Sequence, residues 1–133
     1  MVPPALAERA TEWRAKATPN VRIEANRPDF RQLLAQSTLS ISQAGYNTVL
    51  DVLAAGPRSI LVPFAAHEET EQTDRANALA ARGRAVVIPE NDISGPRLAA
   101  AVAEALSAPG PAAETLDMGG AERSAQILLD LVP

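Results

Sequence analysis

The sequence predicts an α/β fold: a three-layer, Rossmann-like parallel sheet of about four or five strands, flanked by helices. Two observations lead to this prediction. Short apolar or alternating segments follow one another with helical segments between them, the pattern typical of βαβ units with right-handed crossovers. The 133 residues also suit one domain, and 47% of them are hydrophobic, which is enough for a core without disulfides.

The first third of the chain predicts a helix, a strand and a second helix. Pro3-Pro4 followed by an apolar stripe predicts a helix over 5–17. Alternating residues predict a short strand over 21–25. Asp29 is the expected N-cap of a short helix over 30–36. The side chains expected to face inward there are Phe30, Leu33 and Leu34.

The middle of the chain carries the clearest strand signals. A strand is predicted over 38–42, a break at Gly45, and a helix over 47–55 that ends at Gly56-Pro57. The segment 59–63 is apolar almost throughout, as in a strand that is covered on both faces. We therefore expect it to be a central strand of a parallel sheet.

The last part alternates in the same way. The elements predicted there are a helix over 70–82 closed by Gly83, a strand over 85–88, a helix over 96–107, a linker over 108–111 and a helix over 120–132. We expect one domain over 1–133, with a leading helix (1–18), a core (19–107), and a linker with the C-terminal helix (108–133). Because a doubly wound domain usually begins with a strand, we also expect the natural protein to continue upstream of Met1.

Composition excludes several classes of function. The chain has no cysteine, which excludes disulfides and cysteine-based zinc sites and fits a cytoplasmic location. A net charge of −4 argues against nucleic acid as a partner. No apolar run reaches the ~20 residues that a transmembrane helix needs, and the start lacks a signal-peptide pattern. No histidine, aspartate and glutamate residues have metal-ligand spacing, so we expect no metal.

Two polar stretches follow predicted strands, at the edge where open parallel sheets bind ligands. In the first, a glycine turn at Gly45 leads into a helix, whose free N–H groups and dipole favour an anion. Asn47 and Thr48 add side-chain donors, and Asp51, one turn later, suits ribose hydroxyls. A strand–Gly–helix element is common, however, so an ordinary structural turn is the alternative.

The second stretch, residues 63–72, joins the central strand to the next helix. A carboxylate beside a carboxamide, Glu71-Gln72, suits several sugar hydroxyls, because the pair offers both acceptors and a donor. The alternative is that acidic residues merely suit a helix N-terminus, with Thr70 as the cap. His67, the one histidine, is a further candidate as general base or phosphate ligand; otherwise it is a solvated loop residue.

These residues carry a resemblance to a known family. The motif residues are Gly45-Tyr46-Asn47-Thr48-Val49-Leu50-Asp51, Ala54-Ala55-Gly56, Val62-Pro63-Phe64, Glu71-Gln72, Arg75-Ala76, Leu79 and Gly83. The chain resembles the donor-binding, C-terminal half of GT-B glycosyltransferases. It is most similar to the family 28 C-terminal domain, the group that includes the lipid II-forming N-acetylglucosaminyltransferase. The strong match spans about 39–83, and a looser one spans 19–131.

The resemblance implies a role for each matching position. Gln43, Gly45, Asn47 and Thr48 correspond to the diphosphate-binding turn, although many relatives have histidine or arginine where this chain has Gln43. Asp51 corresponds to a ribose-binding position at which glutamate is more common. Glu71 and Gln72 correspond to the pair that reads the donor sugar. Arg27 is the expected contact to the base.

The resemblance also implies what the chain does and what it lacks. We expect it to bind a nucleotide sugar, UDP-linked, as substrate, with no cofactor, while the family's catalytic base usually comes from the N-terminal half. A hexosyl group would pass to an acceptor held by a missing N-terminal half, which would also make any peripheral membrane contact. The alternatives are a non-catalytic donor-binding subunit that needs a partner protein, a degenerate relative, and a UDP-sugar 2-epimerase-like enzyme.

Overall fold

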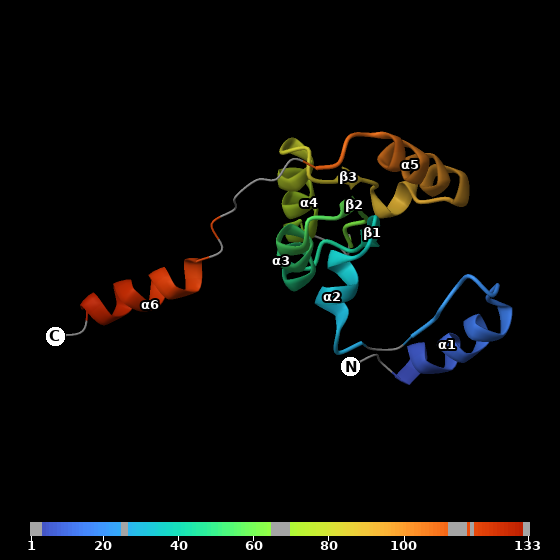
Figure 1. Cartoon of the computed structure of the whole chain (residues 1–133), viewed down its shortest axis with the longest axis horizontal. Helices are drawn as coiled ribbons and strands as arrows, with labels where there is room; N and C mark the ends of the chain where they lie inside the picture. The colour runs from blue at the N-terminus through green and yellow to red at the C-terminus, as the bar shows by residue number, and fades with distance from the viewer. Residues whose placement is uncertain (1–3, 25–26, 65–69, 112–116, 118, 132–133) are drawn as a thin grey trace. The chain divides into compact units, whose positions relative to one another are not determined.

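A computed structural model of the chain describes residues 4–24, 27–64, 70–111, 117 and 119–131 (Figure 1). The chain forms two compact units, Met1–Leu33 and Leu34–Pro133, and each is described by itself. The division falls inside helix α2 (Phe30–Ala35). The assignment of the whole chain to one domain stays a prediction.

The first unit contains helix α1 (Pro4–Lys16), close to the predicted bounds. The strand predicted over 21–25 is wrong for residues 21–24, which form no strand. Val21 is 52% exposed, and its N–H donates to Thr18 O at 2.9 Å in a turn. The carbonyl of Ile23 accepts from Arg14 Nε at 2.7 Å. Alternation describes a half-buried strand, but a ladder also needs a partner strand, and none of the described residues supplies one.

Helix α2 forms almost where it was predicted, but its packing differs from the prediction. Leu34 is buried at 4% exposure, whereas Phe30 and Leu33 remain 41% and 40% exposed. Asp29 O accepts from Leu33 N–H at 3.0 Å, which places Asp29 at the start of the helix, and the Asp29 carboxylate accepts hydrogen bonds from Arg27. A short helix predicts its apolar side chains, but not which of them meet a neighbouring element.

The second unit is built on a parallel sheet in the order β1-β2-β3. Its strands are β1 (Leu39–Ser42), β2 (Arg58–Leu61) and β3 (Val86–Val87), each shorter than predicted. In β2, Ser59, Ile60 and Leu61 are all buried, and the strand pairs on both sides. The central position predicted for this strand is therefore confirmed.

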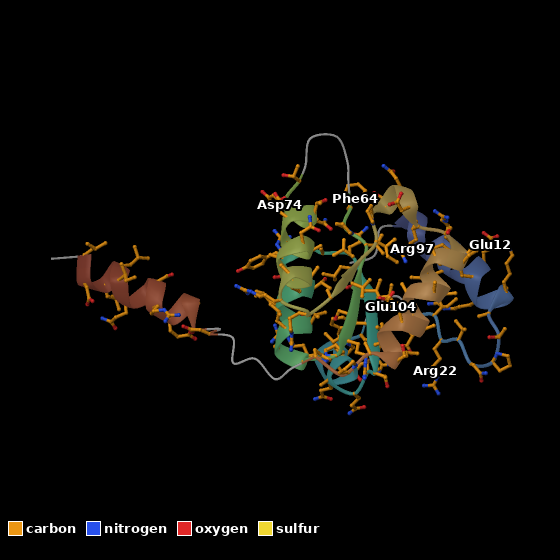
Figure 2. The ribbon with its side chains drawn as sticks, turned by 90° about the horizontal axis from the view of Figure 1, so that it is seen from above. Glu12, Arg22, Phe64, Asp74, Arg97 and Glu104 are labelled. Atoms are coloured by element: carbon orange, nitrogen blue, oxygen red, sulfur yellow. The ribbon has the colours of Figure 1, made fainter. Side chains whose placement is uncertain are left out.

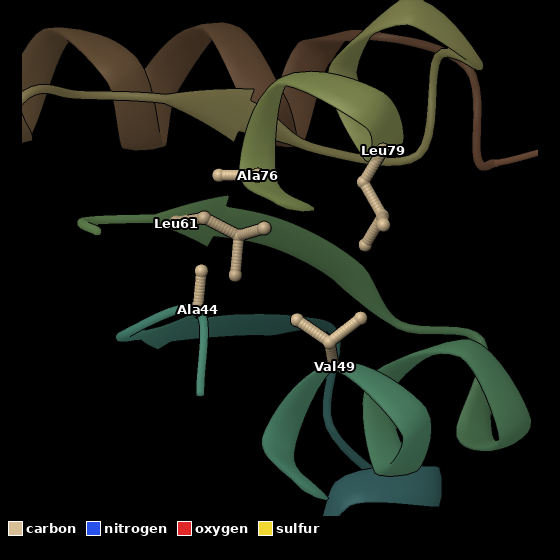
Figure 3. Packing of buried hydrophobic residues seen from close by; sticks show 5 residues of the cluster. All are labelled: Ala44, Val49, Leu61, Ala76 and Leu79. Carbon is tan, nitrogen blue, oxygen red and sulfur yellow. The ribbon is translucent and has the colours of Figure 1, made fainter. Parts of the chain in front are cut away.

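Helices cover both faces of this sheet (Figure 1). On one face lie α3 (Tyr46–Ala55) and α4 (Glu71–Ala81), and the cluster there comprises Ala44, Val49, Leu61, Ala76 and Leu79 (Figure 3). On the other face α5 (Gly95–Ser107) packs its small side chains, and that cluster comprises Ile60, Ile88, Ala101 and Ala105. The predicted three-layer α/β class is confirmed, with three strands in the described residues.

The helix ends in this unit follow local chemistry. Gly56, with φ of 75°, ends α3 in the left-handed conformation, and its N–H donates to Val52 O. Gly83, with φ of 66°, follows α4 in the same region. A short 3-10 helix, η1 (Glu90–Asp92), precedes α5, whose start is capped by Ser94 Oγ accepting from Arg97 N–H at 3.3 Å.

The C-terminal helix α6 (Gly120–Leu131) has no buried residue. Its large apolar side chains are between 59% and 73% exposed: Ile127, Leu128, Leu129 and Leu131. Among the described residues, no helix has the length and apolar character that crossing a membrane requires.

The burial of β2 predicts that replacing a core leucine by alanine costs far more unfolding free energy than replacing a surface leucine. Leu61 is fully buried, so Leu61→Ala should lower the free energy of unfolding by about 2–5 kcal/mol. Leu129 is 68% exposed, so Leu129→Ala should change it by no more than about 0.5 kcal/mol. Urea unfolding followed by circular dichroism measures both, and equal losses would contradict the packing described above.

Candidate functional site

The carboxyl ends of β1 and β2 lie at the same edge of the sheet. Ser42 pairs with Leu61, and Val62 N–H donates to Ser42 O at 2.8 Å. The turn at Gly45 and the loop after β2 therefore leave the sheet side by side. Figure 2 labels Phe64, just after β2, and Asp74, in the first turn of α4, and both lie at this end of the unit.

The start of α3 is open and electropositive. Gly45 is its N-cap, no side chain caps it, and its first turn carries no acidic residue. The first helical bond runs from Val49 N–H to Gly45 O at 3.0 Å. The backbone N–H groups before it therefore have no acceptor among the described residues: they belong to Tyr46, Asn47 and Thr48. Such a helix end binds anions through these donors and the helix dipole.

The start of α4 is different, although it lies at the same edge. Glu71 and Asp74 in its first turn already offset the positive end of the helix dipole. Thr70 is the N-cap residue of α4, as the structural alternative predicted, but its side chain makes no capping hydrogen bond. Of these two helix starts, only that of α3 suits a phosphate.

The predicted residues of α3 lie together on one face. Asp51 follows Asn47 by four positions and Thr48 by three, so the Asp51 side chain neighbours each of them on the helix surface. Asp51 and Thr48 are half-buried, whereas Asn47 and Gln43 are exposed. A carboxylate thus lies one turn from the donors of the helix start, far enough away to accept from a hydroxyl group rather than oppose a phosphate.

Gln72 connects the second stretch to the strand before it. Its Oε1 accepts from Phe64 N–H at 3.2 Å, which fixes the first turn of α4 against the carboxyl end of β2. No hydrogen bond from the amide nitrogen of Gln72 to another described residue is present, so its two donor hydrogens suit a ligand. Glu71 is next to it with a side chain that is 79% exposed, and so is accessible from solvent.

Arg75 joins the two stretches, a contact that the sequence did not reveal. Its Nη1 donates to Ala44 O at 2.7 Å across 31 residues, and its guanidinium lies 5.7 Å from the ring centroid of Tyr46. Its Nη2 lies 3.7 Å from Glu71 Oε2. The spacing of four residues on a helix predicts the ion pair with Glu71, but no local pattern predicts the contact with Ala44.

Arg27 belongs to the first unit, and all three nitrogens of its guanidinium donate hydrogen bonds to carboxylates. Nε and Nη2 donate to the two Asp29 oxygens at 2.9 and 2.6 Å, and Nη1 donates to Glu24 at 2.9 Å. These bonds hold the pKa of the Asp29 carboxyl below its ordinary value and raise the pKa of the Arg27 guanidinium. A contact from Arg27 to a base would therefore use the flat face of the guanidinium.

His67 lies outside the described residues. Among the residues that the structure describes, no group of three or more histidine, aspartate or glutamate side chains is arranged to hold a metal ion.

A cavity of about 200 Å³ lies at the opposite, amino edge of the sheet. Its lining includes Arg58, Arg84, Val86 and Ala105. Arg58 Nη2 donates to Ala108 O at 3.0 Å, at the end of α5. This placement of a cation at the negative end of a helix dipole accounts for Nη2 of Arg58, whereas its buried Nε has no hydrogen-bond partner among the described residues.

Comparison with known protein families identifies the family of this chain. The model of the glycosyltransferase family 28 C-terminal domain matches residues 5–128. The chain belongs to this family. The resemblance inferred from the motif residues is thereby confirmed.

Relatives of this family 28 domain include bacterial transferases of one kind. The chain is 33% identical over 123 residues to the UDP-N-acetylglucosamine–N-acetylmuramyl-(pentapeptide) pyrophosphoryl-undecaprenol N-acetylglucosamine transferase of an Exiguobacterium strain, covering 92% of this chain and 34% of that protein. It is 39% identical over 89 residues to the transferase of the same name from Rhodospirillum centenum, covering 65% of this chain and 24% of that protein. The chain thus spans about a third or less of these relatives.

A solved structure supports the same fold. The crystal structure of the glycotransferase of kitacinnamycin matches with a TM-score of 0.60 and 24% identity, covering 87% of this chain and 26% of that chain. This likeness confirms the predicted α/β fold.

The contacts of Arg27 predict a shift in the titration of Asp29. Arg27→Ala should raise the pKa of Asp29 toward the ordinary value of an aspartate. A lowered folded-state pKa means that the pair stabilises the fold above the unfolded-state pKa and loses this effect as pH falls through the folded-state value. Carboxyl ¹³C NMR titration measures the change. Arg22→Ala is the control, and an unchanged Asp29 midpoint in Arg27→Ala would contradict the contact.

Proposed function

We propose that this chain is the portion of a glycosyltransferase that binds the nucleotide-diphospho-sugar donor, with a UDP-sugar as its substrate. The observation that carries the proposal is the uncapped start of α3 behind Gly45, at the carboxyl edge of the sheet, in a family 28 domain. The names of the relatives support a UDP-linked donor, since they specify UDP-N-acetylglucosamine. They are transferases, which favours group transfer over an epimerase reaction.

The proposed contribution to the reaction is electrostatic. When the bond between sugar and diphosphate breaks, negative charge grows on the departing diphosphate. The N–H groups at the start of α3 point where that charge develops, and stabilise it without reorganisation. Gln43, Asn47 and Thr48 add side-chain hydrogen bonds from the same turn, with Gln43 supplying no charge.

The rest of the donor is assigned to other residues of the chain. Asp51 accepts from the ribose hydroxyls, and Glu71 with Gln72 binds the hydroxyls of the sugar. Arg27 stacks the flat face of its guanidinium on the base, because the guanidinium nitrogens already donate to Asp29 and Glu24. His67 stays a candidate for the diphosphate end of the site.

The acceptor and the catalytic base are assigned to a further portion of the enzyme, in the same protein or in a partner subunit. The relatives named above are about three times as long as the matched segment or longer, which leaves room for such a portion. The apolar residues that α6 leaves exposed suit a protein partner. A cytoplasmic location is part of the same proposal, and so is any membrane contact through the acceptor portion.

Gly45 provides the first test. A Cβ built at Gly45 would meet Thr48 Oγ1 at 3.9 Å and nothing closer, so the protein itself leaves this space open. With φ of −59°, alanine is also free of backbone strain. Gly45→Ala should therefore change the free energy of unfolding by less than about 1 kcal/mol. The added methyl group would enter the open space beside the N–H donors. Gly45→Ala should therefore weaken UDP binding by about 10-fold or more, which corresponds to the loss of one charge-assisted contact.

Isothermal titration calorimetry of the 133-residue chain with UDP measures this effect, and thermal unfolding checks the fold. Gly95→Ala is the matched control, because Gly95 also lies at a helix start and has no atom within 4 Å of a built Cβ. Absence of UDP binding by the wild type at millimolar concentration, or equal binding by Gly45→Ala, would overturn the proposal.

Asp51 provides an independent test of the ribose assignment. If its carboxylate accepts from a ribose hydroxyl, the wild type should bind UDP more tightly than 2′-deoxy-UDP, by about 10-fold. Asp51→Ala should remove this preference and leave binding of 2′-deoxy-UDP nearly unchanged. Competition titrations of the two nucleotides measure the ratio. A preference that survives in Asp51→Ala would assign the ribose to another residue.

A further inference from the structure

Arg75 contacts residues on both sides of the glycine that begins the proposed diphosphate site. Its Nη1 donates to Ala44 O at 2.7 Å, and its guanidinium faces the ring of Tyr46 at 5.7 Å. Ala44 directly precedes Gly45, and Tyr46 directly follows it. A single side chain from α4 therefore holds the turn from both ends.

The turn receives little other support. Strand β1 ends at Ser42, helix α3 begins at Tyr46, and no side chain caps the helix. The buried Ala44 side chain anchors the turn to the core, and the hydrogen bond from Arg75 holds the Ala44 carbonyl. Because the C=O and N–H of a trans peptide point in opposite directions, the bond from Arg75 to Ala44 O also orients the N–H of Gly45.

Arg75 also brings a positive charge to a turn that lacks one. Gln43 is neutral, and the first turn of α3 contains no charged residue. The Arg75 side chain is only 25% exposed, so its charge is less screened than that of a surface arginine. The carboxylates on the same helix are Glu71, whose exposed pair at 3.7 Å is weak, and Asp74. Glu71 therefore remains free to reach the sugar.

We propose that Arg75 is the positioning residue of the donor site: it orients the Ala44–Gly45 peptide and supplies the positive charge that Gln43 does not. This inference rests on the proposed function of the turn as a diphosphate site. Arg75 acts through the turn, so it should affect ligands with a diphosphate and spare those without one.

The test compares UDP with uridine, which lacks the diphosphate. Arg75→Ala should weaken UDP binding by about 10-fold or more, as for loss of a charge-assisted contact. Uridine binding should change by less than about 3-fold, since no charged contact is lost. Arg75→Lys, which keeps the charge without the planar fork, should lie between wild type and Arg75→Ala. Arg82→Ala is the matched control, because Arg82 follows the same helix and is exposed.

A second measurement follows the turn without any nucleotide. The N–H of Val49 donates to Gly45 O, so its hydrogen exchange reports on the first turn of α3. Arg75→Ala should speed this exchange, while Arg82→Ala should not. Thermal unfolding of each variant confirms that it is folded, and Arg75→Lys replaces Arg75→Ala in both measurements if the latter is not.

The outcomes separate this inference from the proposed function. If the wild type binds UDP but Arg75→Ala keeps the same ratio of UDP to uridine affinity, Arg75 is merely structural and the inference fails while the proposed function stands. If the wild type does not bind UDP, the proposed function and the diphosphate role of Arg75 fail together. Faster Val49 exchange in Arg75→Ala would then show only that Arg75 holds the turn.

Discussion

The parallel ladder between β1 and β2 is the interaction on which the candidate site depends. Pairing of Ser42 with Leu61 brings both strands to an end at one edge of the sheet. Because β2 is buried on both faces by α3 and α4 on one side and α5 on the other, a shift of this register would expose its core side chains. The ladder and the core packing together therefore fix where the turn at Gly45 and the start of α4 emerge.

The hydrogen-bond donors at that edge are largely backbone N–H groups at the start of a helix. Three helices of this unit, α3, α4 and α5, pack on the sheet, and each start has a different electrostatic environment. The start of α5 is capped by Ser94, that of α4 carries acidic residues, and that of α3 has neither. Helix starts that are satisfied internally have no donors left for a ligand. The open start of α3 is thus the distinctive chemical feature of the unit, and the family assignment gives it a substrate class.

Local patterns predicted the elements of the second unit well, because their signals lie within a few residues. The apolar run at 59–63, Gly56 after α3, Gly83 after α4 and the polar turn around Gly45 all specify structure from their own chemistry. The prediction failed where an element needed a partner. Residues 21–24 alternate like a strand but find none, and Phe30 and Leu33 are apolar yet exposed. Periodicity shows which side chains are able to be buried, while burial itself depends on what lies opposite.

The sequence by itself therefore determined the α/β class, the central strand and the candidate residues at the carboxyl edge. It also carried the family, because several motif residues occur in a fixed order that one turn alone would not specify. Only the tertiary structure decided how these residues are held: Arg75 reaches Ala44 across 31 positions, and Gln72 fixes the backbone at Phe64. The physical reason is that such contacts arise between elements, after helices have packed on the sheet, and packing depends on surfaces distributed over the whole chain.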